Sequence, residues 1–181
     1  MKDKRIKKLA TMSVLVAVSV VLVSLIHFPL LPAVSFLEYD PADIAILICG
    51  FSFGPVAGLC VTLAAALVQG LTVSASGGLY GILMHVIATG MYVSVSSLLY
   101  KRNRTRKGAV VGIICGAAAM TLIMLPANLL ITPAFMGSPV EAVLQLLPLI
   151  GLFNLLKAGI NGIITFLIYK KISRLIHSFT D

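Results

Sequence analysis

Long apolar blocks, separated by short polar segments, run through almost the whole chain. A helix needs roughly 20 mostly apolar residues to cross the hydrocarbon core of a bilayer, and the chain holds several such blocks and one shorter block. We therefore predict an all-α membrane protein, a bundle of six transmembrane helices that forms a single integral-membrane domain over residues 1–181. The helices are expected at about residues 6–26, 41–53, 56–73, 79–100, 108–131 and 147–176.

Turn-forming residues mark the ends of these blocks. Gly54-Pro55 should stop the second helix sharply, and residues 74–78 should form a turn before the fourth helix. After the fifth helix we expect a longer loop that holds Pro133 and Gly137. The sixth block is long enough for its helix to extend beyond the bilayer.

Basic residues gather on one predicted side of the membrane. The chain is 59% hydrophobic and only 11% charged, with a mean hydropathy of +1.07, whereas a soluble domain is about a quarter charged. All but one of the 14 basic residues precede the first block, lie at residues 101–107 or follow the last block. Such clusters mark cytoplasmic ends, so both termini are expected in the cytoplasm. The net charge of +8 therefore reflects membrane topology and predicts no nucleic-acid partner.

The outer side receives the acidic loop residues. Threading six helices places Glu38, Asp40 and Glu141 there, with Asp43 just inside the second helix. A count of five or seven helices would divide the basic clusters between the two sides of the membrane.

The chain shows no energy source of its own. It has no internal repeat of the kind found in many secondary transporters and no G-x-x-x-x-G-K-[ST] phosphate loop. At 181 residues it is also small for a carrier that alternates its access alone. If the chain transports a solute, we expect another subunit to supply the energy.

The sixth helix carries the sharpest polar signal. Asn154, Lys157 and Asn161 are spaced i, i+3 and i+7, so they share one helix face. An ammonium group in hydrocarbon costs at least ~2.5–3.5 kcal/mol, so Lys157 should face an interior cavity or a partner. We interpret this face as a ligand site whose amine and amides bind a polar ring or carbonyl. The alternatives are a lysine that reaches the membrane interface, or an ion pair with Glu141, Asp40 or Asp43.

The segment before the second helix is rich in acidic residues. Asp40 has the character of an N-cap, Pro41 suits the first helical turn, and Asp43 complements the positive end of the helix dipole. We favour this capping role for Asp43 over direct contact with a ligand. Glu38 and Tyr39 precede the cap and are candidates to line an outward-facing site.

Two further helices carry candidate positions. In the fifth, Asn128 follows Pro126, and it would join the same pocket if it faces Asn154 and Lys157; the alternative is a hydrogen bond between helices. In the first, Ser13 and Ala17 form a small-xxx-small pair that lets another helix approach closely, either within this bundle or on a partner protein.

No catalytic or metal-binding set is visible. The three cysteines are scattered singly and form no C-x-x-C pair. His85 is alone in the fourth helix, and no nucleophile–base arrangement accompanies it. We therefore predict no catalytic residue, no metal site and no enzymatic activity.

These segments together resemble the substrate-binding S components of energy-coupling-factor (ECF) transporters, most closely the riboflavin-binding RibU family. The F-G-P-x-A-G turn at residues 53–58 is shared by many S components, whereas the D-x-x-D and N-x-x-K segments are more specific to flavin binders. The similarity covers nearly the full length and includes Ser13-x-x-x-Ala17, residues 37–43, residues 53–58, Met120-Thr121, Asn128, Pro133, Gly137, residues 153–159 and the basic tail.

The resemblance implies the function of the chain and its partners. It implies capture of riboflavin, or of a related flavin, from outside a prokaryotic cell by a multi-pass protein of the plasma membrane. Riboflavin would be the transported ligand, and no cofactor is implied. A separate membrane scaffold protein and two cytoplasmic ATPase subunits would drive release inward.

The resemblance also implies roles for single residues. Asn154 and Lys157 would hydrogen-bond the isoalloxazine ring. The Ser13/Ala17 face would dock on the scaffold protein, although Ser13 stands where the family usually has alanine. Glu38-Tyr39 stands where a neutral residue is common. The expected lining of the pocket consists of Asn128, Gly137, Glu38, Tyr39 and Asp40.

Two alternatives remain open from the sequence. One is an S component for another vitamin or a modified base. The other belongs to a different class, a small proton-coupled carrier that works alone and uses Asp43 and Lys157.

Overall fold

Six α-helices make up most of residues 2–180, the part of the chain that the computed structural model describes. A short antiparallel hairpin and two 3-10 turns lie in the connections. In chain order the elements are α1 (Lys2–Leu25), β1 (Phe28–Pro29), η1 (Pro32–Val34), β2 (Glu38–Tyr39), α2 (Ala42–Phe53), α3 (Pro55–Leu71), η2 (Ala75–Gly77), α4 (Gly78–Arg102), α5 (Arg106–Met136) and α6 (Val140–Thr180).

All six predicted helices are present, but the loop expected between the last two is wrong in extent. α5 continues past residue 131 to Met136, so Pro133 lies inside the helix, and α6 begins well before residue 147, so Glu141 lies in its first turn. The remaining connection turns at Gly137, whose φ of +61° suits a residue without a Cβ.

Pro133 favours a loop from sequence alone, because a proline removes one backbone donor and usually ends a helix. The carbonyl of Pro133 accepts hydrogen bonds from the N–H groups of Gly137 and Ser138, which close the last turn of α5. Pro148 likewise lies inside α6. At the other end of the chain, α1 begins at Lys2 and includes the basic cluster, because lysine and arginine are good helix formers.

The short helix α2 lies at the centre of the bundle. It packs against α1, α3, α4 and α6, and its residues from Ala42 to Ser52 are all buried. A helix that is apolar on every side is expected in such an interior position. Its N-terminus comes directly after the hairpin, so the acidic segment at residues 38–43 is carried into the interior.

α4 and α5 approach closely along a row of glycines. Gly108, Gly112 and Gly116 are spaced four residues apart on α5 and are buried. A Cβ at Gly112 would overlap the backbone of Ser96, and a Cβ at Gly116 would overlap the backbone carbonyl and the ring of Tyr92. Small residues at this spacing let two helix backbones come together.

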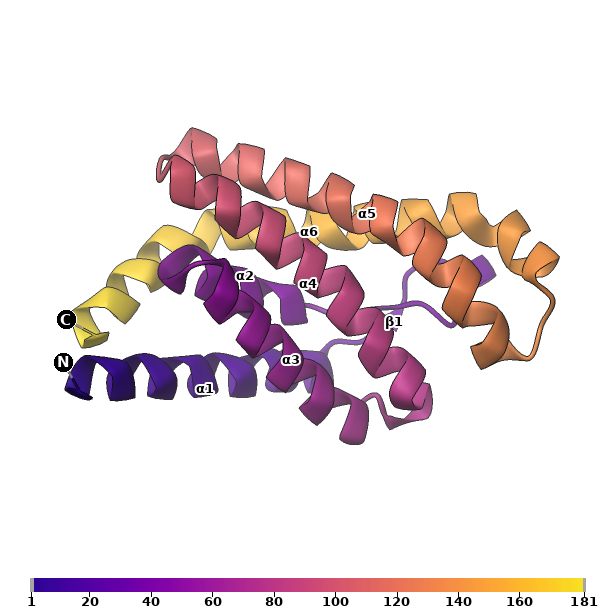
Figure 1. The fold of residues 1–181 in the computed structure, drawn as a ribbon, viewed down its shortest axis with the longest axis horizontal. Helices are drawn as coiled ribbons and strands as arrows, with labels where there is room; N and C mark the ends of the chain where they lie inside the picture. Colours follow the sequence, from indigo (N-terminus) through magenta and orange to yellow (C-terminus); the bar gives the residue numbers. More distant parts are fainter. Residues whose placement is uncertain (1, 181) are drawn as a thin grey trace.

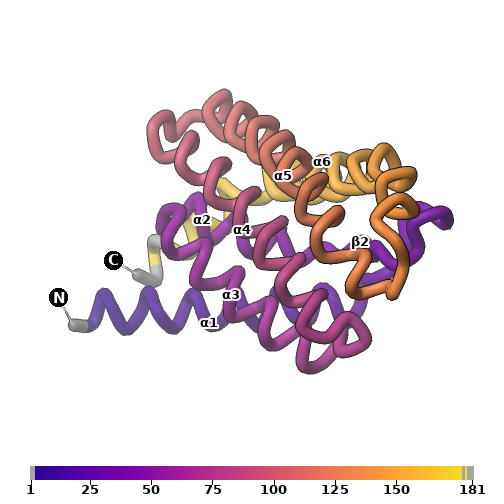
Figure 2. Tube along the Cα trace, turned by 45° about the vertical axis from the view of Figure 1, so that its right-hand side comes forward, coloured from indigo at the N-terminus to yellow at the C-terminus, as the bar shows by residue number. Residues whose placement is uncertain are grey.

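The two ends of the bundle differ in the connections that they carry (Figure 1). Both termini lie at one end, together with the α2–α3 and α4–α5 turns. The β1–β2 hairpin and the α3–α4 and α5–α6 connections lie towards the other end, as the tube in Figure 2 also shows. This arrangement agrees with antiparallel helices that cross a layer repeatedly.

Four of the described helices are long and apolar enough to cross a membrane, namely those within Asp3–Leu25, Ala75–Arg102, Arg106–Met136 and Val140–Ile176. α2 and α3 are apolar but shorter, with 12 and 17 residues. Large apolar side chains are exposed on the outer faces, for example Leu122, Leu130 and Leu167. The chain is therefore a membrane protein, and the count of six spans stays a prediction.

We expect Gly116→Ala to lower the thermal stability of the detergent-purified protein by about 1–3 kcal/mol, because the added methyl group forces α4 and α5 apart. Gly159→Ala on α6 is the matched control, since a Cβ there meets nothing within 4 Å. The control should be neutral or slightly stabilising. Equal melting temperatures for the two variants would show that the glycine row does not set the helix spacing.

Candidate functional site

A cavity of about 310 Å³ lies in the half of the bundle away from the termini. This volume is within the roughly 300–1,000 Å³ usual for small-molecule sites. Its wall combines the segment at residues 36–40 with side chains of α1, α3, α4, α5 and α6. The bundle therefore holds a chamber to which almost every long helix contributes.

A buried ion pair forms the most polar part of this wall. Lys157 Nζ lies 2.6 Å from Asp40 Oδ2, and the two side chains are only 9% and 13% exposed. The interior position expected for Lys157 is confirmed. Lys157 also forms the ion pair with Asp40 that the sequence offered as an alternative to a ligand contact. Both residues also line the cavity, so the pair is placed where a ligand would meet it.

The electrostatics of the hairpin residues follow from this pair. Burial alone would raise the pKa of Asp40, but the positive charge of Lys157 and the hydrogen bonds from Lys157 and Ala42 hold it below its ordinary value. Asp40 is therefore ionised at neutral pH. Burial, with the charges of Asp40 and Asp43, raises the pKa of Tyr39, so its phenol keeps its proton and remains a donor.

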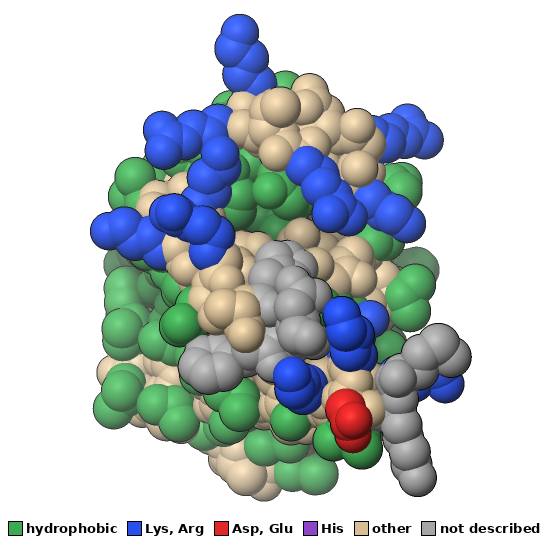
Figure 3. Space-filling model, turned by 90° about the vertical axis from the view of Figure 1, so that its left-hand side faces the viewer, with side chains coloured by type: hydrophobic (Ala, Val, Ile, Leu, Met, Phe, Trp, Pro, Cys, Tyr) green, Lys and Arg blue, Asp and Glu red, His purple; other side chains and the backbone are tan. Residues whose placement is uncertain are grey.

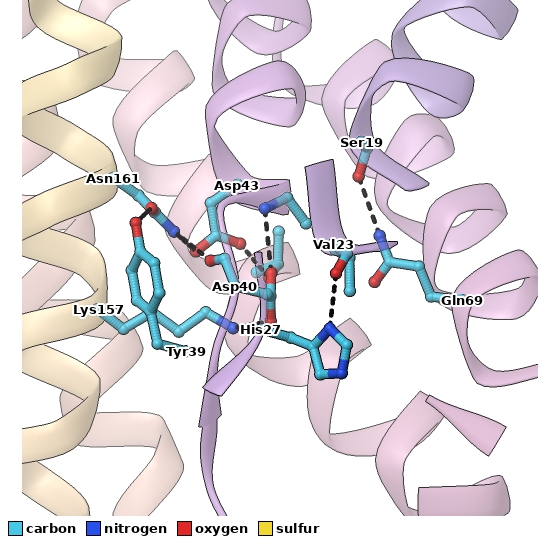
Figure 4. Close-up of polar contacts among 11 residues, drawn as sticks. Ser19, Val23, His27, Tyr39, Asp40, Asp43, Gln69, Lys157 and Asn161 are labelled. Carbon is cyan, nitrogen blue, oxygen red and sulfur yellow. Dashed lines mark hydrogen bonds and ion pairs between the residues drawn. The ribbon is translucent and has the colours of Figure 1, made fainter. Parts of the chain in front are cut away.

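The ion pair belongs to a hydrogen-bond network that joins the hairpin to α6 (Figure 4). Asp40 Oδ1 accepts from the N–H of Ala42 at 3.0 Å and so satisfies a backbone donor at the start of α2, although Pro41 and not Asp40 is the N-cap residue. Asn161 Nδ2 donates to the Asp40 carbonyl at 3.0 Å, and Asn161 Oδ1 accepts from the Tyr39 hydroxyl at 2.9 Å. These contacts hold the end of the hairpin against the middle of α6.

Asp43 lies deeper in the same network: it stands in the first turn of α2, as expected, but its side chain makes no capping hydrogen bond to that helix. Its Oδ1 accepts from the Thr89 hydroxyl at 2.6 Å, and its Oδ2 accepts from Asn161 Nδ2 at 2.9 Å. The side chain is fully buried. Asp43 therefore ties α2 to α4 and α6, because its carboxylate points into the bundle and not towards the N–H groups of its own helix.

The three polar residues of α6 differ in position. Asn154 and Lys157 line the cavity, whereas Asn161 is not part of the wall and is occupied by the network just described. Asn154 is buried and donates from Nδ2 to the carbonyl of Ile150 at 2.8 Å. Asn161 is two helical turns beyond Asn154 towards the C-terminal end of α6, so it lies outside the chamber on that side.

The other predicted pocket residues are distributed around this chamber. Glu38 lines it, while Tyr39 packs on the ring of Phe28, with centroids 5.4 Å apart, and is not part of the wall. Asn128 lines a smaller cavity of about 120 Å³ that shares several wall residues with the first. Asn128 donates to the Met124 carbonyl, and Gly137 caps α5 outside both walls.

Several lining residues were not predicted from the sequence. His85 and Ala88 come from α4, and Gln69 from α3 donates to Ser19 on α1 at 3.0 Å. Apolar side chains fill most of the remaining wall: Met84, Met120, Met124, Phe36, Phe135 and Phe153. A Met or Phe in an apolar helix looks like ordinary core, so the sequence holds no signal for these positions.

Ser13 and Ala17 lie on an exposed face of α1, far from the cavity wall. The Ser13 hydroxyl donates to the carbonyl of Leu9 in its own helix at 3.1 Å. This exposure excludes close packing of the pair within the bundle and leaves the face open to lipid or to a partner.

Comparison with known proteins identifies the family. The model of the family described as "ECF transporter, substrate-specific component" matches residues 7–169. The chain belongs to this family. As an ECF substrate-specific component, it is part of a membrane transporter and not an enzyme.

Named relatives of this ECF component are similar over most of its length. The riboflavin transporter FmnP of Bacillus subtilis is 29% identical over 177 residues, which are 93% of this chain and 93% of that protein. The riboflavin transporter RibU of Staphylococcus aureus is 27% identical over 174 residues, which are 92% and 90% of the two chains. RibU of Streptococcus thermophilus is 32% identical over 123 residues, which are 67% of this chain and 58% of that protein.

A solved structure has the same fold. The S component of a bacterial ECF transporter superposes with a TM-score of 0.81 at 28% identity, covering 94% of this chain and 98% of that one. The arrangement of six helices around a chamber is thus the fold of an ECF S component.

We expect Lys157→Met to destabilise the ligand-free protein by roughly 3–5 kcal/mol, because it leaves the Asp40 carboxylate buried and unpaired. The double variant Asp40→Asn/Lys157→Met removes both charges and should recover part of the loss. Thermal unfolding in detergent measures both variants. A double variant less stable than the single one would contradict this account.

The ion pair also has a defined pH dependence. The pKa of Asp40 is lowered in the folded state, so the contribution of the ion pair to stability is fully present above the ordinary Asp value of 3.8. That contribution is lost only as pH falls through the lower folded value.

Proposed function

We propose that this chain is the riboflavin-binding subunit of an ECF-type importer, which captures the vitamin from the outer side of the cell membrane. The observation that carries the proposal is the chamber with a charged and amide-bearing wall at Lys157, Asp40 and Asn154 and thioether and phenyl groups beside it. The relatives that match nearly the whole chain are named riboflavin transporters, which supports flavin as the ligand.

The chemistry of the wall suits a flat ring with one polar edge. Met84, Met120, Met124 and Phe153 offer polarisable and aromatic surface for the faces of an isoalloxazine ring. Asn154 and Lys157 would hydrogen-bond the carbonyl and nitrogen atoms of its edge. Lysine can do so from within its ion pair, because an ammonium group has three donors.

The rest of the predicted site has supporting roles in this proposal. Glu38 and Asp40 line the chamber at the hairpin, and Tyr39 and Asn161 hold the hairpin in place. Asn128 belongs to the adjoining smaller cavity, and Gly137 shapes the turn above it. The ribityl chain of riboflavin, which carries hydroxyl groups, would lie towards the hydroxyl and amide groups of Ser74, Ser76 and Gln69.

The proposed topology has six spans, with both termini in the cytoplasm. Figure 3 views the end of the molecule where the termini lie, and lysine and arginine side chains gather there over the helix ends. The positive-inside rule makes this the cytoplasmic end. The chamber, which lies towards the opposite end, then faces outward, and α2 and α3 complete the count as short spans within a single domain of residues 1–181.

The proposed partners are an ECF transmembrane scaffold protein and two cytoplasmic ATPase subunits. The exposed Ser13/Ala17 face of α1 would contact the scaffold, since small residues allow close approach of a second helix. This chain would supply specificity, and the ATPases would supply the energy for release.

The first test is a flavin titration of the detergent-purified protein. We expect a bound yellow chromophore, or saturable quenching of riboflavin fluorescence at one site per chain. Lys157→Ala should weaken binding about tenfold or more, because it leaves a polar atom of the ligand unpaired. Lys170→Ala, an exposed lysine further along the same helix, is the control and should bind as the wild type does.

Two other results would redirect the assignment. A colourless protein that ignores riboflavin would point to an S component for another vitamin. Uptake by this chain alone, dependent on the proton gradient and not on ATPase subunits, would instead support a proton-coupled carrier.

We expect Ala17→Leu to abolish riboflavin uptake by cells while leaving flavin binding to the purified protein unchanged, because the larger side chain blocks the approach of the scaffold helix. Ala118→Leu on the exposed face of α5 is the matched control and should spare both. Loss of binding as well as uptake in Ala17→Leu would mean that the residue matters for folding of the bundle.

A further inference from the structure

His85 on α4 presents a buried nitrogen that nothing else in the site explains. The residue lines the cavity, and its Nε2 is buried without a hydrogen-bond partner among residues 2–180. The other histidine of the wall is different, since His27 Nδ1 lies 3.0 Å from the carbonyl of Val23 (Figure 4). An unpartnered buried polar atom costs about 1–3 kcal/mol, so such atoms are rare unless they have a use.

Groups around His85 are already committed to other partners. Asp40 uses one carboxylate oxygen for Lys157 and the other for the N–H of Ala42. The carboxylate of Asp43 accepts hydrogen bonds from Thr89 and Asn161. The chain therefore leaves the imidazole facing the same polar region as the ion pair but gives it no partner there.

The neighbours of His85 on α4 leave space for a flat molecule. Gly81 and Ala88 lie one turn before and one turn after it on the cavity face, and both are small. Met84 adds a thioether beside them. A planar ring can therefore lie along this helix face with its edge directed at His85.

We propose that His85 is a specificity-determining ligand contact, whose Nε2 hydrogen-bonds the polar edge of a planar heteroaromatic ring within reach of Asn154 and Lys157. This inference rests on the proposed flavin function and adds a third side chain, from a different helix, to the recognition of the ring. Rings that lack a donor or acceptor at this edge would leave the imidazole unpaired and bind weakly.

Replacing His85 by glutamine and by asparagine tests whether Nε2 contacts the ligand or the residue has only a structural role. The amide of glutamine reaches about as far as Nε2, whereas the amide of asparagine reaches only as far as Nδ1. We would measure the dissociation constants of H85Q, H85N and H85F by fluorescence quenching, with melting temperatures recorded for each variant. The ligands are riboflavin and lumiflavin, which keeps the isoalloxazine ring and has a methyl group in place of the polyol chain.

The expected result is that H85Q binds both ligands within about threefold of wild type, while H85N and H85F bind both at least tenfold more weakly. If H85F does not fold, the glutamine and asparagine pair still decides the question. Wild-type affinity in H85N, or equal losses in H85Q and H85N, would overturn the contact through Nε2. A loss seen with riboflavin but not with lumiflavin would assign His85 to the polyol chain and overturn the ring-edge contact.

Failure of the proposed function gives a separate result. Wild-type protein that binds neither flavin would remove the flavin assignment, and the role of His85 with it. Wild-type protein that binds both flavins, with unchanged affinity in every His85 variant, would remove only the role of His85.

Discussion

The carboxylate of Asp40 is the point on which the rest of the site depends. This carboxylate neutralises Lys157 inside the bundle and accepts from the N–H of Ala42 at the start of α2, while the backbone carbonyl of the same residue accepts from Asn161. A lysine in the apolar interior is costly unless an opposite charge, a polar group or water meets it. Here the hairpin folds inward over α6 and supplies that charge, and this inward fold places the start of α2 in the interior.

The chamber follows from the same constraint. Because α2 starts at the level of the ion pair and is only 12 residues long, it fills only the half of the bundle nearer the termini. The longer helices α4, α5 and α6 continue beyond its N-terminus, and the space that they enclose there is lined by their side chains. The network of Asp43, Thr89 and Asn161 forms a polar layer between the chamber and the packed half.

Sequence reasoning located the helices and the main polar residues but not their partners. Lys157 could be assigned an interior position because charge in hydrocarbon is costly, and the spacing of Asn154, Lys157 and Asn161 placed them on one face. Which of these residues line the cavity depends on where the hairpin docks, which is a tertiary contact between residues more than 100 positions apart. Among the residues three or four positions from His85 only Thr89 is polar, so the place of His85 in the wall could not be read from periodicity. Pro133 suggested a loop because local propensity does not include the packing that keeps α5 continuous.

The central position of α2 also affects what the protein does to the membrane around it. Ile46, Leu47 and Cys49 are completely buried where a water-filled passage would otherwise run from the chamber to the end of the bundle at the termini. An ion or proton that entered the chamber would meet packed hydrocarbon and not a continuous aqueous path. A membrane crowded with copies of this protein would therefore keep its electrical insulation, with each copy able to hold a solute without acting as a leak.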